Sequence, residues 1–65
     1  MNDLQIKGDW NQTKGSIKQA WGDLTDDDVT AIEGRRDRLV GAIQKRYGVA
    51  QEEAERQVDH WMGKA

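Results

Sequence analysis

The chain has 65 residues, no cysteine and a formal net charge of −2. A chain of this length forms a single domain (1–65) with a small core, and the absence of cysteine excludes a disulfide framework or a thiolate zinc site. The net negative charge argues against strong nonspecific binding to nucleic acid. No apolar run is long enough to span a membrane, and the first residues lack the features of a signal peptide. We therefore expect a cytoplasmic monomer that uses no membrane and no cofactor.

The first predicted helix spans about residues 10–21. Asp9 is its expected N-cap, because Gln12 follows three residues later as in a capping box. Gly22 is expected to end the helix in the left-handed conformation. The apolar residues on one stripe of this helix are Trp10, Ile17 and Trp21.

The best-determined point of the sequence is the corner that follows. Thr25 is the predicted N-cap of the second helix, and Asp28 stands at the position that completes a capping box. Leu24 and Val29 have the spacing of a hydrophobic staple across the same helix start. These signals predict a tight turn between two helices.

The second predicted helix spans about residues 26–33, buries Val29 and Ile32, and ends or bends at Gly34. Its three consecutive aspartates, residues 26–28, raise the alternative of a Mg²⁺ or Ca²⁺ site. The run lacks the alternating ligands, central glycine and terminal glutamate of an EF-hand loop. We interpret the aspartates as a helix start, where negative charge is favourable.

The third and fourth helices are predicted over about residues 36–47 and 51–62. Gly48 is the expected C-terminal cap of the third helix, whereas Ala50 is a poor N-cap for the fourth. The apolar face of the third helix consists of Leu39, Val40, Ile43 and Tyr47. The apolar face of the fourth consists of Ala54, Val58, Trp61 and Met62.

The glycines follow a repeated pattern with a spacing of seven residues and an offset of twenty-six. The two sets are Gly8, Gly15 and Gly22, and then Gly34, Gly41 and Gly48. The pattern predicts two helical hairpins, packed face to face to enclose Trp10, Trp21, Ile43, Tyr47 and Trp61. Gly15 and Gly41 lie inside predicted helices, where glycine is unfavourable. We therefore expect a close helix crossing at these two glycines.

Catalytic chemistry has little support in the sequence. Ser16 lies inside the first predicted helix, not on a strand-to-helix elbow, and no base is paired with it. His60 is the one histidine, and a surface imidazole at a helix end is its simpler interpretation. We therefore predict no catalytic residue, no metal site and no enzymatic activity.

The third helix carries a basic segment, which is the candidate face for an anion or a partner. Its residues are Arg35, Arg36, Arg38, Lys45 and Arg46. A helix-turn-helix with Gly34 in the turn is the DNA-binding alternative. Val29, Val40 and Ile43 fit the apolar positions of that motif, whereas Glu33 and Arg35 do not. A solvated basic face is the favoured interpretation.

Three tryptophans in a chain without phenylalanine have two interpretations. They can form a groove for a partner, because tryptophan is frequent at binding hot spots. In a chain this small, we favour the interpretation that they supply the bulk of the core.

The combined pattern over residues 8–62 resembles the CsbD-like family of small bacterial proteins. The segments that carry the resemblance are Trp10, Gly15, residues 21–28, 34–37, 39–41, 43–44 and 46–48. The resemblance implies an all-α bundle of four short helices, arranged as two orthogonally packed hairpins as in SAM-domain-like folds. It also implies an association with the general stress response and no established enzymatic activity.

Two hypotheses about function follow from this resemblance and from the residues. In the first, the protein is a helical module that binds DNA or a protein partner through the basic face of the third helix. In the second, it is a hydrophilic protein that protects other molecules by its abundance. We favour a non-enzymatic, stress-associated protein of unassigned molecular activity.

Overall fold

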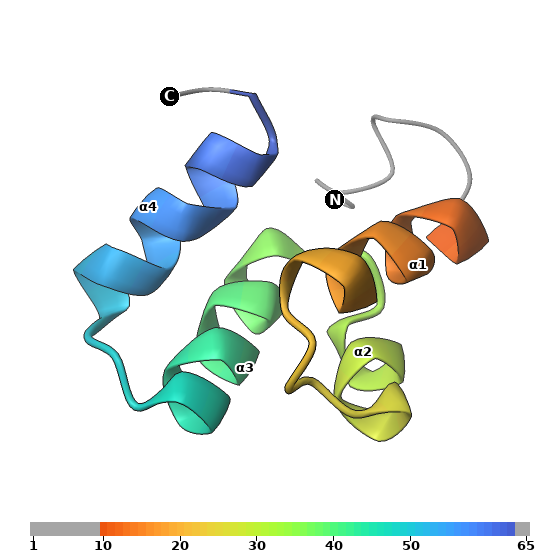
Figure 1. Ribbon diagram of the computed structural model, residues 1–65, viewed down its shortest axis with the longest axis horizontal. Helices are drawn as coiled ribbons and strands as arrows, with labels where there is room; N and C mark the ends of the chain where they lie inside the picture. The colour runs from red at the N-terminus through yellow and green to blue at the C-terminus, as the bar shows by residue number, and fades with distance from the viewer. Residues whose placement is uncertain (1–9, 64–65) are drawn as a thin grey trace.

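The computed structural model describes residues 10–63, which form four helices and contain no strand. The prediction of an all-α class is therefore confirmed. The helices are α1 (Trp10–Ala20), α2 (Asp26–Ile32), α3 (Arg36–Tyr47) and α4 (Gln51–Trp61) (Figure 1). The predicted bounds of α3 match the observed ones, and the other three helices each end one residue earlier than predicted.

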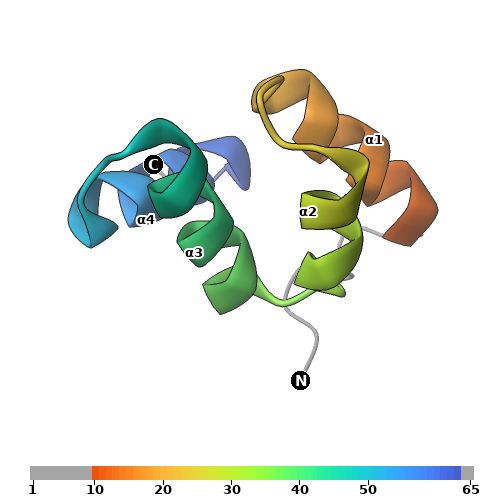
Figure 2. The same ribbon diagram turned by 90° about the horizontal axis from the view of Figure 1, so that it is seen from below.

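The four helices contact one another in chain order, so that α3 lies between α2 and α4. Viewed from below, α1 and α2 occupy one side of the molecule and α3 and α4 the other (Figure 2). Few contacts join α1 to α4 directly, which leaves the space between them to be filled by side chains. The orthogonal, SAM-like packing of two hairpins stays a prediction.

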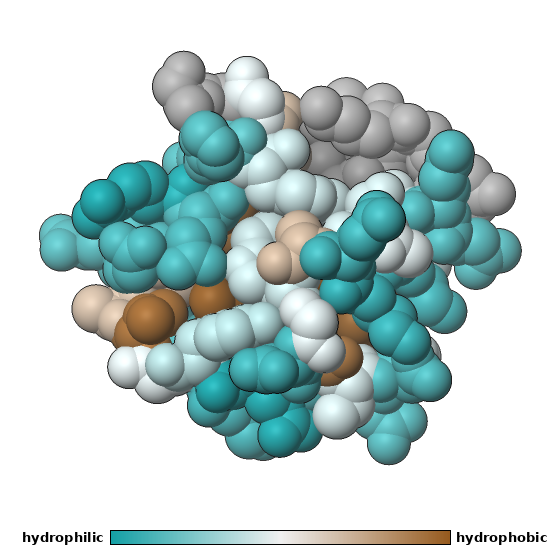
Figure 3. Space-filling model, viewed as in Figure 1, coloured by the Kyte–Doolittle hydropathy of each residue, from teal (hydrophilic) through white to brown (hydrophobic). Residues whose placement is uncertain are grey.

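The core consists of the apolar residues that the helical periodicity selects, together with Leu24 in the first corner. Its members are Ile17, Trp21, Leu24, Val29, Ile32, Leu39, Val40, Ile43, Ala54, Val58 and Met62. The face of the molecule in Figure 3 is largely hydrophilic, with small hydrophobic areas between polar side chains. Of the three tryptophans, Trp21 is buried, whereas Trp10 and Trp61 are only partly buried against this core.

The prediction that Tyr47 lies in the core is wrong, because 38% of its surface is exposed. Tyr47 is the last residue of α3, and its ring extends towards the first corner. There its hydroxyl oxygen accepts a hydrogen bond of 3.1 Å from the backbone N–H of Asp23. The phenol therefore links the end of α3 to the turn between α1 and α2.

The start of α2 confirms the predicted capping box. The N–H of Asp28 donates to the Thr25 hydroxyl, and the N–H of Thr25 donates to the Asp28 carboxylate, both at 3.1 Å. Leu24 and Val29 are both buried, as the hydrophobic staple requires. The corner is thus determined by residues that are close in the sequence.

Two predictions about helix ends need correction. Gly22 does not have a positive φ; α1 ends before Trp21, and a turn closed by the hydrogen bond from Leu24 N–H to the Trp21 carbonyl follows. The C-cap of α2 is Glu33, with φ of 53°, and Gly34 after it also has a positive φ. The predicted cap at Gly48 is confirmed, with φ of 67°.

The predicted close crossing at Gly15 and Gly41 is wrong. Apart from its own helix, a Cβ atom added at either glycine would meet no atom of residues 10–63 within 4 Å. Packing among these residues therefore requires neither glycine. Ala50 caps α4 without a side-chain hydrogen bond, as expected. Asp9 and Gly8, which the sequence assigns to a cap and to the glycine pattern, lie outside the described residues.

Candidate interaction surface

The structure distributes the five basic residues of the candidate face over separate locations. Arg36, at the start of α3, faces α4 and donates from Nη2 and Nε to Oδ1 of Asp59, at 2.8 and 3.1 Å. This ion pair joins α3 to α4 and is partly shielded from solvent. Arg36 therefore belongs to the packing between two helices and not to an open basic face.

Arg38 and Arg46 are also paired within the chain, on the side of α3 that faces α2. Arg38 donates to the Glu33 carboxylate and, at 3.2 Å, to the Ala31 carbonyl at the end of α2. Arg46 donates from Nε to Oδ2 of Asp28 at 2.6 Å. Both arginines thus hold α3 against α2.

Asp28 has the most strongly perturbed carboxylate of the described residues. Its pKa is lowered to about 2, first by the hydrogen bond from Arg46 and then by the backbone N–H of Thr25. The pKa of Asp26 is also lowered, because Lys18 of α1 donates a hydrogen bond to it. Two of the three consecutive aspartates are therefore occupied by cations of the chain itself. The interpretation of this run as a helix start agrees with the geometry.

The two remaining basic residues, Arg35 and Lys45, make no ion pair with any residue between 10 and 63. Arg35 is the N-cap residue of α3, but its side chain makes no capping hydrogen bond. Both residues are exposed. They are the cations that α3 leaves available for another molecule.

Lys45 borders a hollow of about 330 Å³ between α2 and the outer side of α3. Arg38 and Lys45 are seven residues apart on α3, so two helical turns separate the cations along this surface. We call this surface the α2–α3 groove. It is lined by Asp28, Ala31, Ile32, Arg38, Gly41, Ala42 and Lys45, and the Asp28 carboxylate among them is paired with Arg46.

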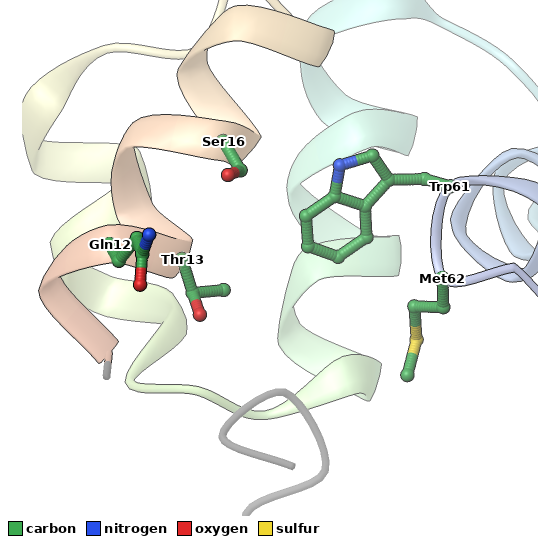
Figure 4. Close-up of a pocket in the computed structure, with 5 residues that line it drawn as sticks. All are labelled: Gln12, Thr13, Ser16, Trp61 and Met62. Carbon is green, nitrogen blue, oxygen red and sulfur yellow. The ribbon is translucent and has the colours of Figure 1, made fainter. Parts of the chain in front are cut away.

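A second hollow, of about 280 Å³, lies between α1 and the end of α4 (Figure 4). Gln12, Thr13 and Ser16 form its α1 side, opposite the indole of Trp61 and the side chain of Met62. The described residues that line it include no histidine, carboxylate or amine beside the Ser16 hydroxyl. Ser16 therefore has no base there to activate it as a nucleophile.

Trp61 also borders a third hollow, of about 390 Å³, towards the C-terminal end of α1. Its indole packs edge-on against that of Trp21, with ring centroids 5.4 Å apart and an interplanar angle of 61°. Trp21 Nε1–H donates to Oε1 of Gln57 at 2.9 Å. His60 lines this hollow, whereas Ser16 lines the other, so the two residues do not share a pocket.

Gln57 is a functional candidate that sequence reasoning missed. The sequence indicates only that the indole N–H of a buried tryptophan needs a hydrogen-bond acceptor. It does not show which polar residue lies beside Trp21. The two are 36 residues apart in the chain. Only the tertiary fold, which places α4 beside the turn after α1, brings them together.

The described part of the chain holds no group of three histidine, cysteine, aspartate or glutamate side chains that converge on a metal position. Its helices are also too short and too polar for any of them to cross a bilayer. The features that remain as candidates for function are surfaces: the α2–α3 groove with its cations, and the hollows on both sides of Trp61.

A helical protein of this size with such surfaces, and with the corner and glycine pattern described above, matches a known family. The family model of CsbD-like proteins covers residues 5–56, and the chain belongs to this family. The match begins at residue 5 and ends at residue 56, whereas the resemblance was expected over residues 8–62.

The chain is similar to several bacterial proteins along nearly its whole length. The UPF0337 protein ECA0631 of Pectobacterium atrosepticum is 59% identical over 61 residues, which are 94% of this chain and 88% of that protein. The UPF0337 protein YjbJ of Escherichia coli strain K12 is 54% identical over 61 residues, with the same coverage of both chains. The UPF0337 protein PA4738 of Pseudomonas aeruginosa is 53% identical over 58 residues, or 89% of each chain.

Proposed function

We propose that this CsbD-like protein is a non-enzymatic, stress-associated module of the bacterial cytoplasm that binds an acidic protein partner through the α2–α3 groove. The association with stress rests on the family resemblance. The binding surface rests on one observation: Lys45 stands unpaired at one end of a groove that no other part of the described chain covers. The protein acts as a monomer in this proposal.

The ion pairs of α3 favour a protein partner over DNA. A DNA-binding helix needs several cations free to contact phosphates, and Arg36, Arg38 and Arg46 already contact carboxylates of the chain. Releasing them for phosphates would cost the contacts that hold α3 to α2 and α4. Arg35 and Lys45 alone give a weak electrostatic attraction to nucleic acid.

The shape of the groove supports the same choice. Its floor of Ala31, Gly41 and Ala42 offers apolar surface, and a Cβ atom placed at Gly41 would meet nothing within 4 Å. Interfaces between proteins combine such an apolar centre with a polar rim. Lys45 at that rim pairs with a carboxylate of the partner, which fixes the partner's register on the groove.

Quantitative affinity capture tests this proposal. The tagged protein and its Lys45→Glu variant are used as baits in lysates of stressed cells, with Lys14→Glu on α1 as a control of equal charge change. We expect specific partners to be recovered equally by the wild type and Lys14→Glu, and at least fivefold less by Lys45→Glu. Equal recovery by all three baits would refute the α2–α3 groove as the binding surface.

A gel-shift titration at low salt tests the DNA alternative. We expect no shifted complex with duplex DNA at protein concentrations up to about 10 µM, a value within the range of about 1–100 µM of ordinary nonspecific dissociation constants at physiological salt. A complex that weakens steeply as salt increases, and that Lys45→Glu weakens further, would replace the protein partner with DNA.

A further inference from the structure

The hollow that Trp21 and Trp61 line has the features of a small-molecule site, separate from the α2–α3 groove. It lies between the C-terminal end of α1 and the second half of α4. Its volume of about 390 Å³ falls within the range of about 300–1,000 Å³ that is typical of ligand pockets. The residues that line it are Ala20, Trp21, Arg56, Gln57, His60 and Trp61.

The aromatic wall of this hollow is held in a fixed arrangement. The two indoles pack edge-on, with centroids 5.4 Å apart. Trp21 is 5% exposed, and its N–H is already satisfied by Gln57. Gln57 is in turn oriented by a hydrogen bond of 3.0 Å from its Nε2 to the Glu53 carboxylate. A ligand therefore meets a wall that needs no rearrangement and has no unsatisfied indole donor.

The hollow is lined by basic and uncharged side chains, and the Glu53 carboxylate contacts two of them, Arg56 and Gln57. None of its described lining residues is a carboxylate, although the chain as a whole has 12 acidic and 10 basic side chains. Arg56 and His60 are four residues apart on α4, so they lie on one face of the helix, at the rim. Both side chains can donate hydrogen bonds to an anion there.

Arg56 is paired in the structure, but the pair is weak. Its guanidinium lies 3.1 Å from Glu53, three residues earlier on the same helix, and 76% of the Arg56 side chain is exposed. Exposed pairs of this kind contribute little and are easily exchanged. Glu53 also keeps its hydrogen bond from Gln57 when Arg56 turns away. An anionic ligand thus competes for Arg56 without leaving a buried charge behind.

From this geometry we infer that the hollow binds a planar aromatic carboxylate. The ring of the ligand packs against the indole of Trp61 and covers Ala20, and its carboxylate lies between Arg56 and His60. A planar ring suits the indole wall, because aromatic rings prefer offset or edge-on contacts with one another. The site is independent of the proposed protein partner, since it shares no residue with the α2–α3 groove.

Two-dimensional NMR with 2-naphthoate as the probe tests this inference. We expect saturable shifts of the two indole N–H signals of Trp21 and Trp61 and of the backbone amides near Ala20 and His60. The neutral analogue 2-naphthamide, and the non-aromatic octanoate, are expected to bind at least fivefold more weakly. Shifts that do not saturate at millimolar concentration, or that map to the α2–α3 groove, would overturn the inference.

Matched variants separate the contributions of ring and charge. Arg56→Gln is expected to weaken binding of 2-naphthoate at least fivefold, whereas Arg35→Gln, which removes one exposed charge elsewhere, leaves it unchanged. Ala20→Leu places a larger side chain in the hollow from an exposed helix position, so the fold is kept and binding is lost. Equal affinity of all three variants and the wild type would rule the site out.

Discussion

Arg46 and Asp28 form the link that holds the end of α3 against the beginning of α2. Nε of Arg46 donates to Oδ2 of Asp28 at 2.6 Å, and the same Asp28 carboxylate accepts the N–H of Thr25. One side chain therefore caps α2 and anchors α3. The carboxylate must be ionised for the ion pair, which makes this link sensitive to acid.

The stability of the protein is expected to fall as the pH drops from about 4 to about 2. The pKa of Asp28 is about 2 in the folded chain, against 3.8 for an ordinary aspartate. A carboxyl group whose pKa is lower in the folded than in the unfolded chain stabilises the fold at pH values above its unfolded pKa. This contribution is lost as the pH falls through the folded pKa. Thermal melts at a series of pH values are expected to show that the Tm of Asp28→Asn falls less over this interval than the Tm of the wild type.

Asp27→Asn is the control for that series. Asp27 is the neighbouring residue in the same helical turn, and it makes no ion pair with a residue of the described chain. Its melts are expected to follow those of the wild type. If Asp28→Asn and the wild type declined in parallel, the Arg46–Asp28 link would not be the source of the acid sensitivity.

Replacing Gly41 by alanine is expected to stabilise the protein. The position lies inside α3 and faces open space, so the variant gains about 1 kcal/mol of helix propensity without a clash. For a domain of this size that corresponds to an increase in Tm of about 4–8 °C. Differential scanning calorimetry measures it directly.

Gly48→Ala is the opposite case and serves as the comparison. Gly48 has φ of 67° at the C-cap of α3, where an alanine side chain is strained. We expect the free energy of unfolding to fall by about 1 kcal/mol, as for other residues with a side chain in the left-handed conformation.

A lower Tm for Gly41→Ala than for the wild type would mean that the helix surface at residue 41 is occupied and not open.

Tyr47→Phe isolates the hydrogen bond between the phenol and the first corner. The variant keeps the ring but leaves the Asp23 N–H without its acceptor in Tyr47. Because the site is exposed, water replaces part of the bond, and the expected loss is about 0.5–1 kcal/mol in urea unfolding. An unchanged urea midpoint would show that the Tyr47 hydroxyl contributes nothing to stability.

The ion pair between Arg36 and Asp59 is expected to couple α3 to α4. A double-mutant cycle with Arg36→Gln and Asp59→Asn measures the interaction free energy between the two side chains. Because the pair is partly exposed, we expect about 0.5–1 kcal/mol, near the upper end for such pairs. Additive effects of the two substitutions would show that the pair does not stabilise the fold.

The sequence predicted the features that depend on neighbouring residues. The capping box of Thr25 and Asp28 and the cap at Gly48 are local, and they define the start of α2 and the end of α3. The periodicity of α3 and α4 selected core residues such as Val40 and Val58, because a helix that packs on one side buries one face. These local signals were sufficient for the number and order of the helices.

The wrong prediction of a close helix crossing at Gly41 came from the residue type and not from its position in the helix. Gly41 is two residues from both Leu39 and Ile43, and two residues turn a helix by about 200°. The periodicity that buried those two residues therefore placed Gly41 on the outer side of α3. The presence of a glycine indicated a close contact, but the face it occupies is the one that opens to the α2–α3 groove.

The links between distant residues could not be predicted. Arg46 and Asp28 are 18 residues apart, Tyr47 and Asp23 are 24 apart, and Trp21 and Gln57 are 36 apart. Each pair depends on the crossing geometry of whole helices. The basic segment of α3 was therefore visible in the sequence, whereas the separation of its paired arginines from the free Lys45 was not.

Site-specific photo-crosslinking tests the central claim that α3 binds a protein partner on its outer side. A photoreactive phenylalanine analogue is introduced at Ala42, in the α2–α3 groove, and separately at Glu52, at the exposed start of α4. In stressed cells, we predict a discrete crosslinked protein from position 42 and none from position 52. Crosslinks from position 52 alone, or none from either position while the protein is abundant, would contradict the claim.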